Sequence, residues 1–122
     1  TTGEEWLTWN HYHSIVAQAM NAPAPHLVHI PSDLLKKVAP RRAGITIYNF
    51  QYNNIFDNSA AKRDLNFQYT IPFLEGARRT IAWLEERGRI ECCDNDPFDD
   101  QLIAAWEKLG TNMARELPDL DR

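Results

Sequence analysis

The sequence predicts a small α/β fold that is mostly helical and contains two or three short strands. Apolar side chains recur at the three- and four-residue spacing of amphipathic helices, most clearly over 73–84 and 98–113. Two short apolar runs, 26–30 and 54–56, instead have the length and the flanking residues of strands. Two strands make a poor sheet on their own, so we expect them to extend a larger sheet contributed by another domain.

Helices are predicted on both sides of the first strand. Thr8 is the expected N-cap of a helix with apolar residues at helical spacing, and Asn21 ends it. Ser32 is the expected N-cap of a second, short helix that Pro40 stops. The residues over 41–53 combine weak alternation with a cluster of aromatic and amide side chains, so no element is assigned there.

Three more helices are predicted in the second half of the chain. A short one lies near 59–65, and a longer one opens at Pro72 and ends where Gly88 supplies the C′ residue. The last helix has Asp96 as its N-cap and a proline in its first turn. We expect residues 1–117 to form one lobe, followed by a frayed tail over 118–122.

The composition is that of an ordinary globular domain and argues against several classes of partner. Thirteen basic and 17 acidic residues give a formal charge of −4, and the basic residues form no stripe, so no nucleic-acid partner is expected. No apolar run is long enough to cross a membrane, and the start lacks a signal-peptide pattern, so no membrane partner is expected. The start at Thr1 leads us to expect a processed or truncated product.

The cysteines and histidines form no complete metal or catalytic site. Cys92 and Cys93 are adjacent and have no third cysteine to pair with, so we expect free thiols and a cytoplasmic location. His11 and His13 point to different sides of their predicted helix, so together they chelate no metal. The acidic residues over 94–100 lack the spacing of a calcium loop and are explained as helix caps.

Five segments occur in an order that is specific when they are taken together. They read EEWLTWNHYHSIVAQAM, HLVHIPSDLL, FDNSAAKRDL, IPFLEGARRTIAWLEE and DNDPFDDQLIAAW. This order resembles the C-terminal part of the extended short-chain dehydrogenase/reductases, the NAD-dependent epimerase/dehydratase family. The stretch 54–84 carries the clearest likeness, although Ala60 stands where the family usually has lysine.

The resemblance implies that this chain is the substrate-side portion of an NAD(P)-dependent epimerase, dehydratase or reductase. In that family, the N-terminal Rossmann half binds NAD or NADP through a G-x-G-x-x-G turn and carries a catalytic Tyr-x-x-x-Lys pair. Neither pattern occurs in this sequence, so the chain itself is expected to bind no cofactor and to be inactive alone. Its implied partners are the missing Rossmann half and a small-molecule substrate, often a nucleotide-linked sugar.

The resemblance also favours substrate contacts in the loop that precedes Asp57. Tyr52, Asn53 and Asn54 are therefore the predicted substrate-binding residues, and no catalytic residue, cofactor contact or metal ligand is assigned. The neighbouring arginines at 41 and 42 suit a phosphate chemically but match the family poorly. An ordinary solvated loop is the alternative interpretation of all these residues.

Two other functional hypotheses stay open. One is a free-standing protein-interaction module with no catalytic role. The other is a small cysteine-dependent hydrolase built on Cys92 or Cys93, although nothing in the sequence supplies a base beside either thiol. Because a missing half would leave apolar surface uncovered, the substrate-lobe hypothesis also predicts self-association into a homo-oligomer.

Overall fold

A computed structural model describes residues 3–117, and the chain divides into two compact units at the boundary between Ile90 and Glu91. The predicted tail over 118–122 lies outside the described residues. No helix in the described part of the chain is long and apolar enough to cross a membrane. The elements, in chain order, are α1 (Trp9–Ala19), α2 (Ser32–Val38), the π-helical turn η1 (Thr46–Phe50), α3 (Ser59–Leu65), α4 (Phe73–Glu86), the 3-10 turn η2 (Cys93–Asn95) and α5 (Phe98–Glu116).

The predicted α/β fold is wrong, because residues 3–117 contain helices and no strand. The runs 26–30 and 54–56, which were expected to be strands, are irregular connecting segments. A strand is stable only when its backbone N–H and C=O groups pair with a neighbouring strand. No described segment pairs with either run, so their apolar composition alone does not make them strands.

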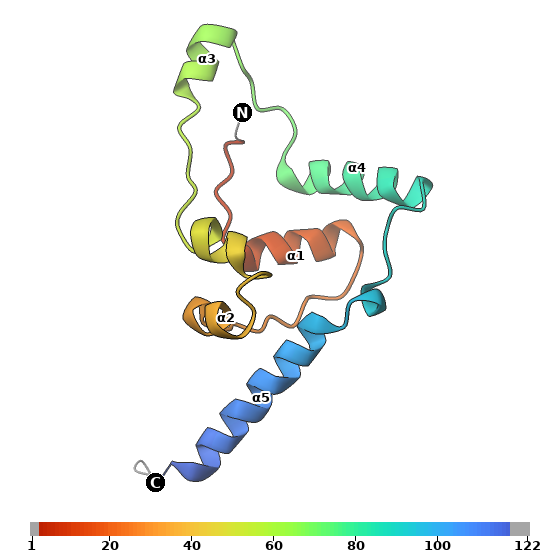
Figure 1. Ribbon diagram of the computed structural model, residues 1–122. Coiled ribbons are helices and arrows are strands. Elements are labelled where there is room, and N and C mark those ends of the chain that lie inside the picture. The colour runs from red at the N-terminus through yellow and green to blue at the C-terminus, as the bar shows by residue number, and fades with distance from the viewer. Residues whose placement is uncertain (1–2, 118–122) are drawn as a thin grey trace. The chain divides into compact units, whose positions relative to one another are not determined.

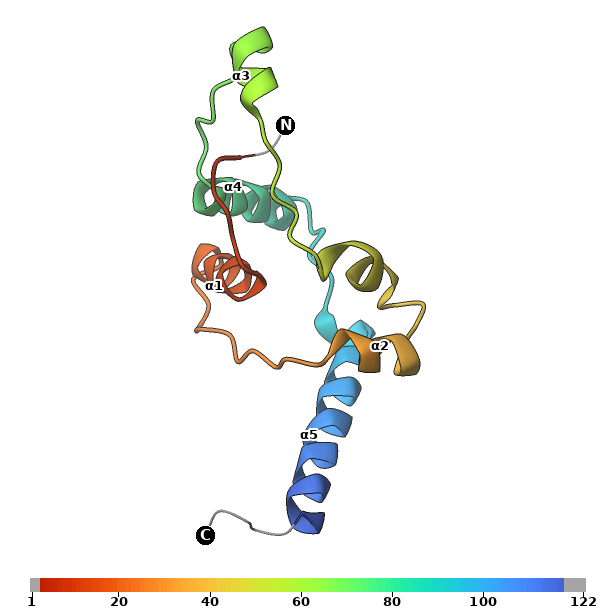
Figure 2. The same ribbon diagram turned by 90° about the vertical axis from the view of Figure 1, so that its left-hand side faces the viewer.

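In the first unit, α1 and α4 lie side by side (Figures 1 and 2). Ile15 and Ala19 are the buried residues of α1. The rings of Tyr12 on α1 and Phe73 on α4 pack with their centroids 5.1 Å apart. This aromatic contact fixes the N-terminal end of α4 against the middle of α1.

The second packed region of this unit joins α2 to η1 through a turn. Ala39, Ala43 and Ile47 are buried, and they follow one another at four-residue spacing. The Ala43 N–H donates to the Ala39 carbonyl and the Ile47 N–H to the Ala43 carbonyl, each at 2.9 Å. The backbone here is therefore helical and not a strand, because the buried positions repeat every four residues and not every two.

Several helix ends match the sequence predictions. The Thr8 hydroxyl accepts the His11 N–H at 3.2 Å, which confirms Thr8 as the N-cap of α1. Gly88 follows α4 with a φ of 58°, and its N–H donates to the Glu85 carbonyl at 3.0 Å, so the predicted C′ glycine is confirmed. Ser32 is instead the first residue of α2 and its side chain makes no capping bond, so that prediction is wrong.

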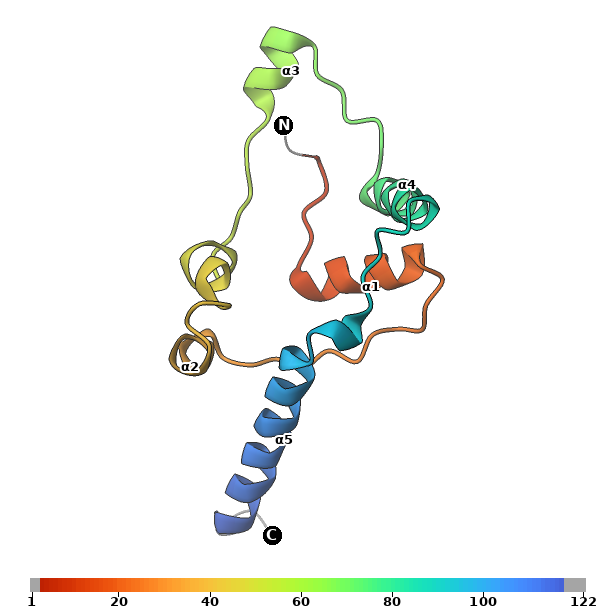
Figure 3. The ribbon, with the colours of Figure 1, turned by 45° about the vertical axis from the view of Figure 1, so that its right-hand side comes forward.

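The short helix α3 lies at the end of two irregular segments that connect it to η1 and to α4 (Figures 1 and 3). The N-cap of α3 is Asn58, and the preceding Asp57 carboxylate accepts the Ser59 N–H at 2.9 Å and the Ser59 hydroxyl at 2.5 Å. These two bonds hold the pKa of Asp57 below its ordinary value. The turn that leads into α3 is therefore stabilised by bonds between Asp57 and Ser59, which are only two positions apart.

The second unit consists, in its described part, of η2 and α5. The N-cap of α5 is Pro97, so the prediction of Asp96 as the N-cap is wrong by one residue; the Asp96 carboxylate precedes the cap and accepts the Phe98 N–H at 3.3 Å. Leu109 and Met113, on the predicted apolar face of α5, keep 43% and 53% of their surface exposed. Only Ile15, Ala19, Ala39, Ala43 and Ile47 form the buried apolar core of residues 3–117.

Candidate functional site

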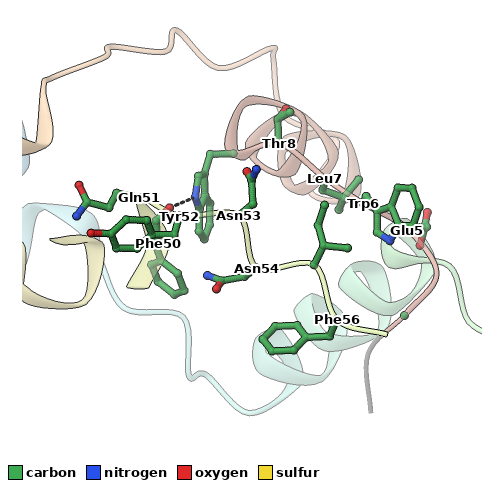
Figure 4. Close-up of a pocket in the computed structure, with 13 residues that line it drawn as sticks. Glu5, Trp6, Leu7, Thr8, Phe50, Gln51, Tyr52, Asn53, Asn54 and Phe56 are labelled. Carbon is green, nitrogen blue, oxygen red and sulfur yellow. Dashed lines mark hydrogen bonds between the residues drawn. The ribbon is translucent and has the colours of Figure 1, made fainter. Parts of the chain in front are cut away.

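A cavity of about 490 Å³ lies in the first unit between the segment that leads into α1 and the segment that follows η1 (Figure 4). Gln51 and Tyr52 stand at one end of the view, Glu5 and Trp6 at the other, with Asn53 and Asn54 between them. The lining residues are Gly3, Glu5, Trp6, Leu7, Thr8, Trp9, Phe50, Gln51, Tyr52, Asn53, Asn54, Ile55 and Phe56.

The three predicted substrate-binding residues all line this cavity. Tyr52 is 64% exposed, and Asn53 and Asn54 are also exposed. The Asn54 amide donates to Asn49 Oδ1 at 2.7 Å, and the Tyr52 N–H donates to the Asn49 carbonyl at 3.0 Å. Asn49 on η1 therefore fixes the start of the loop, while the side chains of Tyr52 and Asn53 face open solvent or the cavity.

Four aromatic residues complete the cavity wall, and sequence reasoning did not assign them to a site. They are Trp6, Trp9, Phe50 and Phe56. The Trp9 ring meets the Phe50 ring at 4.8 Å with their planes 62° apart. The clustering of aromatic and amide residues over 48–54 was a visible signal, but the contribution of Trp9 depends on a contact across 41 positions.

The charge of the cavity is set by a single carboxylate. Glu5 is the one charged residue among the described residues that line it. Arg41 and Arg42, considered for a phosphate, are exposed in the turn after α2 and are not part of the lining. The wall therefore offers aromatic faces and neutral amides to a ligand, and no cation for a phosphate.

Glu5 also joins the lead-in segment to the start of α4. Its carboxylate accepts hydrogen bonds from the Tyr69 hydroxyl and, at 2.6 Å, from the Phe73 N–H. The Tyr69 bond, followed by the Phe73 bond, holds the pKa of Glu5 below its ordinary value. The same carboxylate raises the pKa of Tyr69 to about 12. A carboxylate at the N-terminus of α4 is also favourable for the helix dipole.

Two further cavities lie beside the first. One, of about 540 Å³, is mostly apolar and is formed by α1, α4 and the residues before α4. The other, of about 450 Å³, is lined by Trp6, Ile55 and Phe56, with Glu4 and Lys62 at its edge. The Lys62 ammonium and the Glu4 carboxylate form an ion pair at 2.5 Å.

No group of His, Cys, Asp and Glu side chains in residues 3–117 has an arrangement that could hold a metal ion. The Cys92 and Cys93 thiols are exposed, and each points to one oxygen of the Asp94 carboxylate, at 3.7 and 3.8 Å. His29 Nε2 lies 2.9 Å from Asn10 Oδ1, so this histidine ties the loop after α1 to that helix. Neither arrangement places a histidine beside a thiol.

The fold and the cavity define this chain as a small helical protein, over its described residues, with an exposed aromatic and amide pocket. The chain matches no protein-family model, no curated protein and no solved structure.

Proposed function

We propose that this chain is the substrate-binding lobe of an NAD(P)-dependent epimerase, dehydratase or reductase, and that its ligand is a nucleotide-linked sugar or a related small molecule. The ordered motifs over 54–84 motivate the proposal. The observation that carries it is the cavity that Tyr52, Asn53 and Asn54 line together with several aromatic residues. A cytoplasmic location belongs to the same proposal.

The chemistry of the cavity suits the sugar or base of such a ligand, which is polar at its edges and ring-shaped. Because Glu5 is the one charged lining residue, the proposal places the phosphates outside this cavity. Amide side chains both donate and accept hydrogen bonds, so Asn53 can pair with hydroxyl groups of either role. The aromatic wall offers apolar area without charge. Small-molecule sites commonly combine such apolar walls with a few polar groups that fix the orientation of the ligand.

The described residues do not fit a dinucleotide. Such a cofactor binds where a strand passes through a glycine-rich turn into a helix N-terminus, and residues 3–117 contain no strand. Gly44 and Gly76 lie far apart in the sequence and form no such turn. Under the proposal, NAD or NADP and the catalytic groups belong to the other half of the intact protein, and this chain supplies no catalytic residue.

Ligand-observed NMR with UDP-glucose, at millimolar concentration, tests the proposal on this chain. We expect saturation transfer to the ligand that is reduced severalfold in Tyr52→Ala and in Asn53→Ala. Tyr48→Ala is the matched control, because Tyr48 is 81% exposed on η1 and does not line the cavity. Equal transfer in all three variants, or no transfer at all, would count against the site.

The coding sequence upstream of Thr1 offers an independent test. The proposal requires it to encode a G-x-G-x-x-G turn and a Tyr-x-x-x-Lys pair. A short upstream region without either pattern would overturn the proposal.

A free-standing protein-interaction module is the second candidate, and one observation favours it. Trp6, Ile55 and Phe56 surround a hollow and keep 75%, 61% and 61% of their surface exposed. Exposed apolar groups with polar residues at their edge are typical of protein contacts. The upstream coding sequence distinguishes the two candidates, since only the first requires a nucleotide-binding half.

A further inference from the structure

The lead-in segment, residues 3–8, contributes lining residues to each of the three cavities described above. Gly3, Glu5 and Leu7 line the cavity between α1 and α4. Glu4 and Trp6 line the hollow near α3, on the other side of the segment. From Glu4 to Leu7 the residues alternate between these two cavities, as in an extended chain, whereas Gly3 borders both. Most of the segment also forms one wall of the candidate site (Figure 4).

The segment is held to the rest of the unit by side-chain contacts across a long sequence distance. The Glu5 carboxylate accepts hydrogen bonds from the Tyr69 hydroxyl and the Phe73 N–H. Glu4 pairs with Lys62 on α3. No described strand pairs with the backbone of this segment, so these two carboxylates supply polar contacts that attach it to the rest of the unit.

Gly3 adds a contact that does not depend on charge. A Cβ atom placed on Gly3 would lie 2.9 Å from Tyr69 Cε2 and 3.2 Å from Tyr69 Cζ. The backbone of Gly3 therefore lies directly against the tyrosine ring whose hydroxyl binds Glu5. Tyr69 contacts the segment through both its ring and its hydroxyl group.

We infer that residues 3–8 form a strap that closes one wall of the candidate cavity, and that Tyr69 and Glu5 are the residues that position it. When the Glu5 contacts break, the strap leaves its place and the walls that it contributes to the three cavities open. Ligand retention by the strap rests on the proposed function, whereas the position of the strap itself does not.

Fluorine NMR of the 5-fluorotryptophan protein reports on the strap directly, since Trp6 lies on it and Trp83 lies near the end of α4. In Tyr69→Phe, which removes the hydroxyl group, we expect the Trp6 resonance to move toward its unfolded position. The Trp83 resonance should stay in place.

Matched variants separate this effect from general destabilisation. Tyr48→Phe removes an exposed tyrosine hydroxyl group elsewhere and should leave the Trp6 resonance unchanged. Gly3→Ala should release the strap without altering a charge, because the added methyl group meets the Tyr69 ring. Unchanged Trp6 resonances in both Tyr69→Phe and Gly3→Ala would overturn the inference.

Measuring the saturation transfer to UDP-glucose in the same variants distinguishes failure of the strap inference from failure of the proposed function. With a retaining strap, Tyr69→Phe lowers the saturation transfer to UDP-glucose severalfold. Release of Trp6 with unchanged transfer would support the strap and argue against the cavity as the ligand site. Unchanged Trp6 with reduced transfer would overturn the strap.

Discussion

The Trp9 indole N–H donates to the Phe50 carbonyl at 3.3 Å, and the two rings pack edge to face. This pair joins the first turn of α1 to the last residue of η1, 41 positions later in the sequence. The Trp9 ring also packs on Tyr12, which in turn packs on Phe73 of α4. One row of aromatic contacts therefore connects η1, α1 and α4, and the candidate cavity opens beside it.

Removal of this link should destabilise the first unit. We expect Trp9→Ala to lower the free energy of unfolding by about 2 kcal/mol, because it removes a hydrogen bond and the ring contacts with Tyr12, His13 and Phe50. Trp83→Ala is the matched control, since Trp83 is 44% exposed against 48% for Trp9 and contacts the Arg87 guanidinium at 4.4 Å. Trp83→Ala should lower the free energy of unfolding by about 0.5–1 kcal/mol. Urea denaturation followed by circular dichroism measures both, and equal losses would contradict the assigned role of Trp9.

The Glu5–Tyr69 contact should make stability depend on pH at both extremes. The folded pKa of Glu5 lies below 4.5, so its contribution is complete above that pH and is lost as pH falls through the lower folded pKa. The Tyr69 pKa rises from 10.0 to about 12, so its contribution is complete below pH 10 and is lost between these values. His11 on α1 and Glu4 also act on this pair.

Thermal unfolding of the protein and of Tyr69→Phe over a pH series checks this dependence. The stability difference between them should be largest near neutral pH and shrink in acid and in strong alkali. It should also shrink with added salt, because the groups are exposed and screened by solvent. A difference that is constant across the series would show that the hydrogen bond is not formed.

Two glycines should respond oppositely to alanine. Gly88 has a φ of 58°, so Gly88→Ala should destabilise the end of α4 by about 1 kcal/mol. Gly110 lies inside α5 with open space around its Cα, so Gly110→Ala should stabilise that helix by about 0.5–1 kcal/mol. Amide hydrogen exchange of the two helices measures both effects. Matching signs would contradict the assigned backbone conformations.

The chain by itself should not bind NAD measurably. No glycine pattern for a pyrophosphate occurs in the sequence, and no strand occurs in residues 3–117. Calorimetric titration with NAD and with NADP should give no heat of binding. Micromolar affinity for either cofactor would contradict the assignment of the cofactor to another half.

The purified chain should self-associate. Trp6 and Leu65 are each 75% exposed, and Tyr48 is 81% exposed, which is a large apolar exposure for side chains of this size. Light scattering over a concentration series should show a mass that rises above 14.1 kDa. A monomer at every concentration would argue against an uncovered interface.

The sequence predicted the helices better than it predicted the fold class. Thr8 and Gly88 each act within one helical turn, so their roles follow from the neighbouring residues alone. The ion pair between Glu75 and Arg79, at 2.7 Å, is local in the same way. The runs 26–30 and 54–56 were misassigned because a strand depends on a partner segment that local composition does not reveal.

The sequence by itself determined the five α-helices of the described residues but not the turns η1 and η2, together with the absence of a dinucleotide turn and the cluster of aromatic and amide residues around Tyr52. Each of these depends on the identity and spacing of neighbouring residues. Only the tertiary structure decided that Trp9 and Phe50 meet and that Glu5 binds Tyr69. It also decided that a cavity lies between the lead-in segment and the segment after η1. The two contacts join residues that are 41 and 64 positions apart in the sequence. Whether such distant residues meet depends on how whole elements pack, which local periodicity does not reveal.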